Sequence, residues 1–188
     1  MSTGSPPSYR LPPDVMGRPR DILAIGSLVL EEVVQVDGWP QPGWQGNVRV
    51  ERISRSAGGC AVNVACYAAR LGARSAVVSP IGDGRYGAEV LAELARSGVD
   101  PQFLRHFPDR DGSLLIILSG PGGGWVTLDH GDPIVALAPG DLPVHAAFAA
   151  TRIVHIDGYS FLTAGTPAVA AEALLRARRS GCVISVDG

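Results

Sequence analysis

Ser56-Ala-Gly-Gly-Cys-Ala-Val-Asn63, with Gly82-Asp83 and Gly87 downstream of it, is the stretch that decides how this chain folds. The run lies at the start of a helix that the apolar spacing predicts over residues 62–71. Paired glycines let a ligand approach the backbone because no Cβ is in the way, and a helix start offers unpaired N–H groups to an oxygen-rich ligand. The Asn63 side chain carries a donor and an acceptor, as a sugar hydroxyl does. The stretch therefore predicts a binding site for a hydroxylated ligand.

Short apolar runs along the rest of the chain predict buried strands at 22–25, 75–79, 153–156 and 183–186. Helices are predicted between them at 62–71, 86–97 and 167–180. This alternation predicts an α/β fold whose mainly parallel sheet is flanked by helices. Four further segments suggest strands with one wet face, at 33–36, 47–53, 114–118 and 125–130. The last two read as a hairpin, and together the four predict a second, smaller sheet over the first.

The bulk composition limits the classes of function. The 188 residues predict one domain, and the formal net charge of −2 argues against nucleic acid and anionic membranes as main partners. The three cysteines lack metal-ligand spacing and favour a reduced, cytoplasmic setting. No apolar run reaches the roughly 18 residues that span a membrane. Residues 1–20 are rich in proline, so we expect a disordered tail before one folded unit at 21–188.

Taken in order, the motifs resemble those of the ribokinase-like (PfkB) family of sugar kinases. The resemblance covers residues 20–188, but only the amino-terminal half of the family. It is carried by Gly26 to Glu31, Pro40-x-Pro42-Gly43, Gly58-Gly59-Cys-Ala-Val-Asn63, Ala69-Arg-Leu-Gly72-Ala, Ile81-Gly82-Asp83 with Gly87, and Gly98-Val-Asp100. It implies a ribokinase-like α/β core with a small β-sheet lid, formed by segments near 32–55 and 112–131, and a sugar bound between the two.

The resemblance also implies substrate-binding residues. In the family, the paired glycines and the asparagine contact sugar hydroxyls, which gives these roles to Gly58, Gly59 and Asn63. An acidic residue after the first strand does the same, and its position here is Glu31, where the family commonly has Asp. Asp157 follows a strand at the functional edge of the sheet and is a further predicted substrate contact. Plainer alternatives are a tight turn for the glycines, a helix cap for Asn63 and a solvated lid position for Glu31.

Other polar residues stay without a firm role. Tyr159 aligns about as well with an acidic sugar contact as Asp157 does. Cys60 is either a reactive thiol at a helix start or, on the plainer interpretation, a small core residue. No role is assigned to His130, Asp132 and Asp187.

The parts that would carry out phosphoryl transfer are missing from the sequence. The family transfers a phosphoryl group from ATP, with Mg²⁺, and its base is an Asp in a Gly-Ala-Gly-Asp turn at a helix start. No such turn is present, since Gly82-Asp83 and Gly131-Asp132 lie in the wrong part of the order. We therefore expect no catalytic residue and no metal ligand in this chain, and expect ATP and Mg²⁺ to bind segments outside it. We also expect a truncated chain that is inactive alone.

Three functions remain to be weighed. The first is an ATP-dependent kinase acting on the hydroxymethyl group of a small-molecule sugar or nucleoside, and the sequence does not choose among fructose, ribose, keto-deoxy acid and nucleoside substrates. The second is a non-catalytic sugar-binding or dimerising remnant of that family. Lid strands expose edges that favour pairing in a homodimer, and Trp39, Trp44 and Trp125 fall in the lid, where they can stack on substrate or pack in an interface. The third, a dinucleotide-binding domain, is weak because Gly26 is not followed by the required glycine fingerprint.

Overall fold

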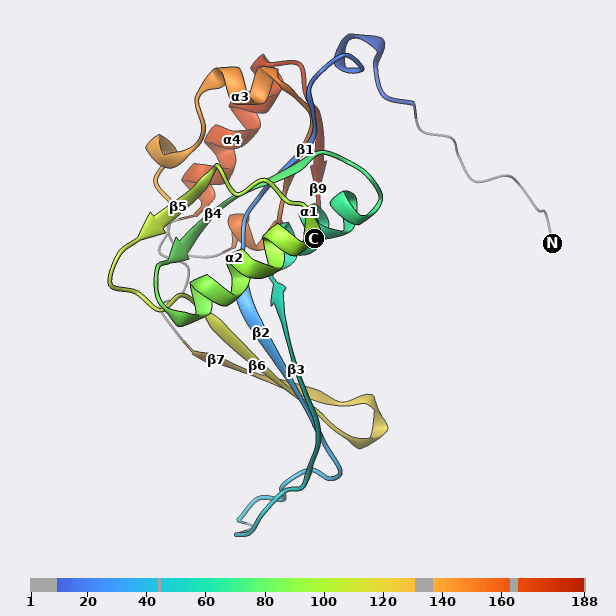
Figure 1. Ribbon diagram of the computed structural model, residues 1–188, viewed down its shortest axis with the longest axis vertical. Coiled ribbons are helices and arrows are strands. Elements are labelled where there is room, and N and C mark those ends of the chain that lie inside the picture. The colour runs from blue at the N-terminus through green and yellow to red at the C-terminus, as the bar shows by residue number, and fades with distance from the viewer. Residues whose placement is uncertain (1–9, 44, 131–136, 163–165, 188) are drawn as a thin grey trace, which may run out of the picture.

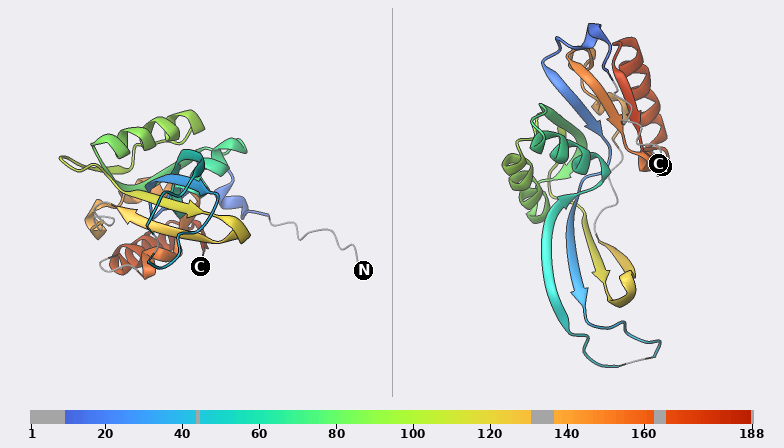
Figure 2. Two further views of the ribbon diagram at one scale, coloured as in Figure 1. Left: turned by 90° about the horizontal axis from the view of Figure 1, so that it is seen from below. Right: turned by 90° about the vertical axis from the view of Figure 1, so that its right-hand side faces the viewer.

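The computed structural model describes residues 10–43, 45–130, 137–162 and 166–187 (Figure 1). It consists of a layered α/β core and a second sheet that projects from the core as a narrow arm (Figures 1 and 2). Trp44 and Asp132 lie outside the described residues.

The core sheet has the strand order β5-β4-β1-β8-β9, and each pair of neighbours is parallel. Its strands are β1 (Arg20–Ile25), β4 (Ser75–Gly82), β5 (Leu104–Phe107), β8 (Thr151–Ile156) and β9 (Val183–Val186). The predicted α/β class with a mainly parallel sheet is confirmed. Strand β5 was not predicted from the sequence, and it extends the sheet at the edge next to β4.

Helices cover both faces of the core sheet (Figure 2). On one face lie α1 (Cys60–Arg70) and α2 (Arg85–Ser97), and on the other lie α3 (His145–Ala149) and α4 (Pro167–Arg179). Alternate residues of β4 divide between these layers, since Val77 packs with α1 and α2 while Val78 packs with α4. Short 3₁₀ turns connect the elements: η1 (Pro13–Val15), η2 (Pro121–Gly123), η3 (Pro139–Asp141) and η4 (Gly158–Phe161). Burial on both faces explains why the core strands are continuous apolar runs.

The second sheet has the order β3-β2-β6-β7 and is called the lid sheet below. Its strands are β2 (Val29–Val36), β3 (Val50–Gly58), β6 (Leu114–Ser119) and β7 (Trp125–His130). The hairpin predicted for the last two is confirmed by the antiparallel pairing of β6 with β7. Strand β3 runs on to Gly58, five residues beyond its predicted end at 53, so the glycine motif is the end of a lid strand.

The root of the lid sheet is part of the core. Leu30, Ala57 and Leu114, from three neighbouring lid strands, are all buried in the cluster under α1 and α2. At the far end, Trp39 lies against the turn of the β6–β7 hairpin and its Nε1 donates to the carbonyl oxygen of Pro121 at 3.3 Å. Within the described residues, the lid sheet is therefore fixed to the core at its root.

Residues 10–19 differ from the predicted disordered tail. Val15 is fully buried, and the Arg18 guanidinium donates to the carbonyl oxygens of Thr151 at 2.8 Å and Gly181 at 3.3 Å. These contacts hold the segment against the amino-terminal edge of the core sheet, so the prediction was wrong for this part. Residues 1–9 lie outside the described residues.

Candidate functional site

Three chain segments meet at the carboxyl-terminal edge of the core sheet. They are the turn after β1 at Gly26-Ser27, the junction of β3 with α1 at 58–60, and Asp157 directly after β8. Carboxyl ends of parallel strands collect at one edge, which is where ligands bind in open α/β sheets. Here the root of the lid sheet joins the same edge, so the predicted binding motif lies where core and lid meet (Figure 1).

The paired glycines are required by close contacts within the protein. Gly59 precedes α1 with φ +93°, and a Cβ there would lie 2.5 Å from the carbonyl oxygen of Ser27. A Cβ on Gly58 would lie 2.1 Å from Cδ of Glu31. Glycine at both positions therefore lets the β1–β2 turn and the Glu31 carboxylate lie directly against the helix start.

Glu31 points at the start of α1. Its Oε1 accepts a hydrogen bond from the Gly59 N–H at 3.3 Å, and the side chain is partly buried. No side chain caps α1 at Gly59, and the Glu31 carboxylate lies at this end of the helix, where the positive end of the helix dipole favours negative charge. The alternative of a simply solvated lid residue does not fit this geometry.

Asn63 lies one turn into α1. Its N–H donates to the Gly59 carbonyl oxygen at 2.9 Å, so it is inside the helix and is not the cap. The helix-cap alternative is therefore wrong. The Asn63 side chain is exposed at the same end of α1 that receives Glu31.

Asp157 is held by hydrogen bonds within the protein. The residue is fully buried, and its Oδ2 accepts hydrogen bonds from the Ser27 N–H at 2.5 Å and the Ser27 hydroxyl at 2.7 Å. Its Oδ1 accepts from the Ser160 N–H at 2.8 Å and the Ser160 hydroxyl at 2.7 Å. Both oxygens are thus engaged within the protein, where the carboxylate fixes the β1–β2 turn, and a substrate contact of Asp157 stays a prediction.

Ser27 is a residue of this site that the sequence did not single out. Its hydroxyl donates to Asp157 and accepts from the Cys60 N–H at 3.0 Å, which links the end of β8 to the start of α1. The only sequence signal was its place directly after a strand and a glycine.

The Cys60 thiol is not activated. Burial is the main cause that raises its pKa, and the negative charges of Asp157, Asp187 and Glu31 raise it further against an opposing hydrogen bond with Ser27. A thiol with a raised pKa stays protonated, which supports the plainer interpretation as a small structural residue.

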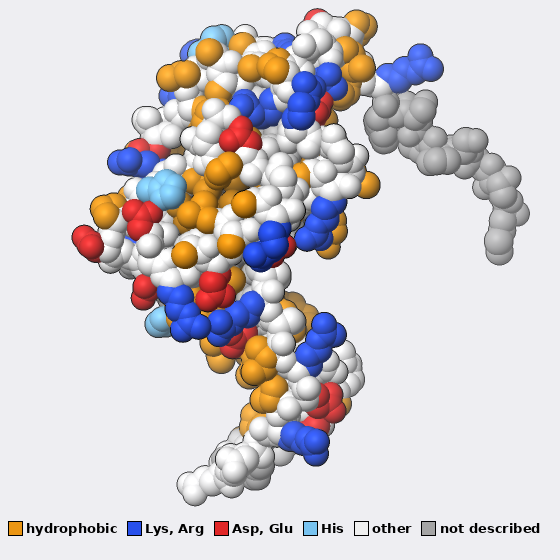
Figure 3. Space-filling model, viewed as in Figure 1, with side chains coloured by type: hydrophobic (Ala, Val, Ile, Leu, Met, Phe, Trp, Pro, Cys, Tyr) orange, Lys and Arg blue, Asp and Glu red, His pale blue; other side chains and the backbone are white. Residues whose placement is uncertain are grey.

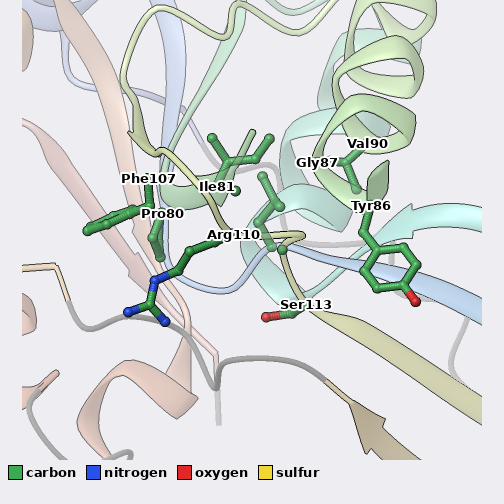
Figure 4. A pocket seen from close by; sticks show the side chains of 11 residues that line it. Pro80, Ile81, Tyr86, Gly87, Val90, Phe107, Arg110 and Ser113 are labelled. Carbon is green, nitrogen blue, oxygen red and sulfur yellow. The ribbon is translucent and has the colours of Figure 1, made fainter. Parts of the chain in front are cut away.

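The second glycine motif, Gly82-Asp83 with Gly87, lies at a further pocket. Pro80, Phe107, Tyr86, Arg110 and Ser113 are among the residues that line it, where β4 and β5 end and α2 begins (Figure 4). The backbone here is tightly packed, since the N–H of Gly84 donates to the Arg110 carbonyl at 2.8 Å and that of Gly87 donates to the Asp111 carbonyl at 3.1 Å. The motif thus holds the loop that leads into lid strand β6.

The structure also places Tyr159, Asp187 and His130, for which the sequence indicated no firm role. Tyr159 is 61% exposed and lines an open groove together with Cys60 and Asp187. His130 ends β7 and meets the Tyr86 ring edge to face at 6.3 Å between centroids.

Two observations within the described residues bear on where ATP and Mg²⁺ would bind. These residues contain no group of three or more His, Cys, Asp or Glu side chains arranged to hold a metal ion. At the start of α1 the N–H groups of Gly59 and Cys60 are already taken by Glu31 and Ser27, and the Glu31 carboxylate repels a phosphate. Within the same described ranges, every helix is too short or too polar to cross a membrane.

Comparisons with known proteins place this geometry in context. Residues 20–187 match the family described as pfkB family carbohydrate kinase. A nucleoside kinase from Methanothermobacter thermautotrophicus is 26% identical over 92% of this chain and 53% of its own length. A ribokinase from Bacillus subtilis is 30% identical over 73% of this chain and 45% of its own length. The chain thus spans about half the length of the curated relatives it matches.

A solved structure shows the same fold. The fructokinase with bound ATP from Xylella fastidiosa superposes with a TM-score of 0.73 at 21% identity, covering 89% of this chain and 51% of the fructokinase.

Proposed function

This chain belongs to the pfkB family of carbohydrate kinases, and from that premise we propose that it forms the sugar-binding part of an ATP-dependent sugar or nucleoside kinase. The resemblance in its motifs is thereby confirmed at the level of the family. The acceptor group, in this proposal, is a hydroxymethyl group of the substrate.

The observation that carries the proposal is the Glu31 carboxylate held against the glycine pair at the base of the lid. Its Oε1 accepts from the Gly59 N–H, and no other hydrogen bond to Glu31 is made within the described residues. The second carboxylate oxygen is thus left to accept hydrogen bonds from sugar hydroxyls, which are strong when the acceptor is charged. Asn63, exposed on the first turns of α1, supplies an amide that both donates and accepts.

The lid sheet supplies a cover for this site. Strand register puts Glu31, Leu115 and Ser56 side by side on adjacent lid strands, so their side chains share one face of the sheet. Leu115 offers apolar surface to the carbon face of a sugar ring, while Glu31 takes its hydroxyls. A substrate held in this way is shielded from water on one side and oriented on the other.

ATP would supply the transferred phosphoryl group, and we place ATP, Mg²⁺ and the base of the reaction outside the described residues. Two facts support this: the sequence has no Gly-Ala-Gly-Asp turn, and the chain spans about half the length of its curated relatives. The role of the residues present is to bind and orient the substrate. The same proposal places the protein in the cytoplasm, in line with three cysteines that are all free thiols.

Calorimetry with D-ribose, D-fructose and adenosine tests the binding function. We expect at least one of them to bind the 188-residue protein and Glu31→Gln to weaken that binding about tenfold or more, since a hydrogen bond to a charged group is lost. Glu51→Gln is the matched control, because Glu51 is an exposed glutamate of lid strand β3. Equal effects of the two variants, or no binding of any probe, would contradict the proposal. With ATP and Mg²⁺ added we expect no sugar-dependent ADP from this chain alone.

A dimer formed through the lid is a second candidate role, favoured by one observation. Ile53, Val126 and Leu128 are 48–58% exposed, and strand register puts them on the face that packs against α2 at the lid root. We propose a second copy of the chain as the partner. Sedimentation should then show a dimer that Ile53→Glu converts to monomer without loss of sugar binding.

A further inference from the structure

A second acidic site lies beside the first. Asp187 follows β9 at the same sheet edge as Asp157, and an open groove runs from it to the start of α1 at Cys60. The rest of the groove is lined by residues of the turn after β8: Gly158, Tyr159, Phe161 and Leu162. The groove thus borders on the helix start that Glu31 approaches.

Asp187 and Asp157 differ in what their carboxylates are free to do. Asp157 is fully buried with both oxygens hydrogen-bonded inside the protein. The Asp187 side chain is 41% exposed, and its Oδ1 accepts one hydrogen bond, from the Gly158 N–H at 2.5 Å. The remaining oxygen, Oδ2, accepts no hydrogen bond within the described residues and lies 3.5 Å from His155 Nε2. Because Asp187 lines the groove, this oxygen can still accept from a hydroxyl of a ligand there.

His155 lies in β8, and the neighbouring strand β9 ends one residue before Asp187. Its side chain is 7% exposed, and its Nε2 is 3.5 Å from Asp187 Oδ2 without a hydrogen-bond partner of its own within the described residues. Its Nδ1 is 3.1 Å from the hydroxyl of Ser185, the residue paired with it on β9. A buried polar nitrogen without a hydrogen bond lowers the stability of the fold. The direction of Nε2 toward the Asp187 carboxylate therefore indicates a specific contact between these two side chains.

We infer that Asp187 is a further hydroxyl-binding residue of the cleft, that His155 positions it, and that the ligand is a neutral sugar or nucleoside and not a sugar acid. This inference rests on the proposed function and narrows it. The exposed Tyr159 ring in the same groove offers an apolar face for a sugar.

Charge carries the choice of substrate class. Glu31 Oε1 accepts from the Gly59 N–H at 3.3 Å, and Asp187 lines one groove with Cys60, the next residue, so two carboxylates border the same helix start. A carboxylate on the ligand would meet these like charges, whereas neutral hydroxyls find acceptors.

Calorimetry on the 188-residue protein separates this inference from the proposed function. We expect D-ribose, D-fructose or adenosine to bind, D-gluconate to bind at least tenfold more weakly, and Asp187→Asn to weaken the neutral ligand about tenfold. Asp100→Asn is the matched control: its side chain is also 41% exposed and accepts a backbone N–H, from Gln102 at 3.0 Å, but at the opposite edge of the sheet. Unchanged binding in Asp187→Asn, alongside a loss in Glu31→Gln, would overturn this inference and leave the proposed function standing.

The role of His155 has its own readout. Glutamine can place an amide nitrogen near the position of Nε2, whereas phenylalanine fills the space without a donor. We expect His155→Gln to retain ligand affinity and His155→Phe to reduce it severalfold, with similar melting temperatures. Equal loss in both variants, following equal loss of stability, would make the residue purely structural and overturn its positioning role.

Discussion

The core sheet and the lid sheet of this protein follow opposite patterns of burial. Every residue of β4 is buried, whereas every residue of β7 is exposed. The core strands lie between helix layers (Figure 2), while the lid sheet projects away from the core as an arm (Figure 3). Leu30 and Leu114 of the lid nevertheless belong to the main core cluster. The comparison teaches that the lid sheet takes its stability from its root and leaves the rest of its surface for a ligand or a partner.

Alanine substitution of one core leucine and one lid leucine is the strongest test of this difference in burial. Leu23 of β1 is fully buried and Leu128 of β7 is 49% exposed. We expect Leu23→Ala to lower the free energy of unfolding by about 2–5 kcal/mol, since it leaves a cavity, and Leu128→Ala by less than about 0.5 kcal/mol. Urea denaturation measures both. Similar losses at the two positions would mean that the lid face is covered, for example by a second copy.

The next largest loss of stability is expected at Gly59, where the core and lid sheets meet. Gly59→Ala puts a Cβ at φ +93° and 2.5 Å from the Ser27 carbonyl oxygen, so we expect a loss of about 1–3 kcal/mol in stability together with loss of sugar binding. Gly72→Ala is the control, because Gly72 has φ +88° but no atom within 4 Å of an added Cβ. If the two variants lose equal stability and both keep sugar affinity, the close approach at Gly59 is unimportant.

The same contrast explains what the sequence could predict. The buried strands and the helices came from apolar runs and spacing, because burial on both faces leaves a strong pattern. Strand β5 has the sequence Leu-Arg-His-Phe with both central residues exposed, so no run of apolar residues marks it. The continuation of β3 through Ser54 and Ser56 was missed for a similar reason, since those positions are exposed although they pair with β2.

The site was predictable in place but not in detail. The glycine pair and Glu31 are where the motifs put them, but whether they contact a sugar stays a prediction. The hydrogen bonds of Asp157 to Ser27 and Ser160 could not be predicted, because these residues meet only through the fold and their pairing leaves no trace in sequence spacing. The buried Val15 in the supposed tail was missed because composition alone suggested disorder.

A smaller effect on stability is expected from an ion-pair network on the surface beside the core sheet. Asp21 accepts hydrogen bonds from the Arg74 backbone N–H and side chain, and its Oδ1 lies 2.7 Å from Nη1 of Arg152. These contacts lower the pKa of Asp21 from 3.8 to about 2, and the hydrogen bond from the Arg74 side chain contributes most. A lowered pKa means that its stabilisation is complete above pH 3.8 and is lost as the pH falls towards 2. We expect Asp21→Asn to cost about 1 kcal/mol at neutral pH, after discounting for solvent screening, and the difference from wild type to vanish near pH 2 in acid titrations. A constant difference across that range would contradict this.

The smallest effect is expected where an arginine joins the lid to the core. Arg55 of β3 hydrogen-bonds Glu32 of β2, and its Nη1 lies 3.5 Å from Glu89 of α2. The Arg55 side chain is 42% exposed, so Arg55→Ala should change stability less than Asp21→Asn does, because exposed ion pairs are screened. It should still weaken sugar binding a few-fold at low salt, since it removes the ion pair that joins lid strand β3 to α2, and the difference should shrink as salt rises.

Arg96→Ala is the control for that change. Arg96 pairs with Glu93 on the same helix, with a side chain that is 66% exposed, so its loss removes a surface ion pair that does not join α2 to the lid. If both arginine variants bind sugar alike at every salt concentration, the lid is oriented by its buried root alone. A deficit confined to Arg55→Ala would mean that the projecting sheet, although mostly exposed, is set in position from the core by charge as well as by burial.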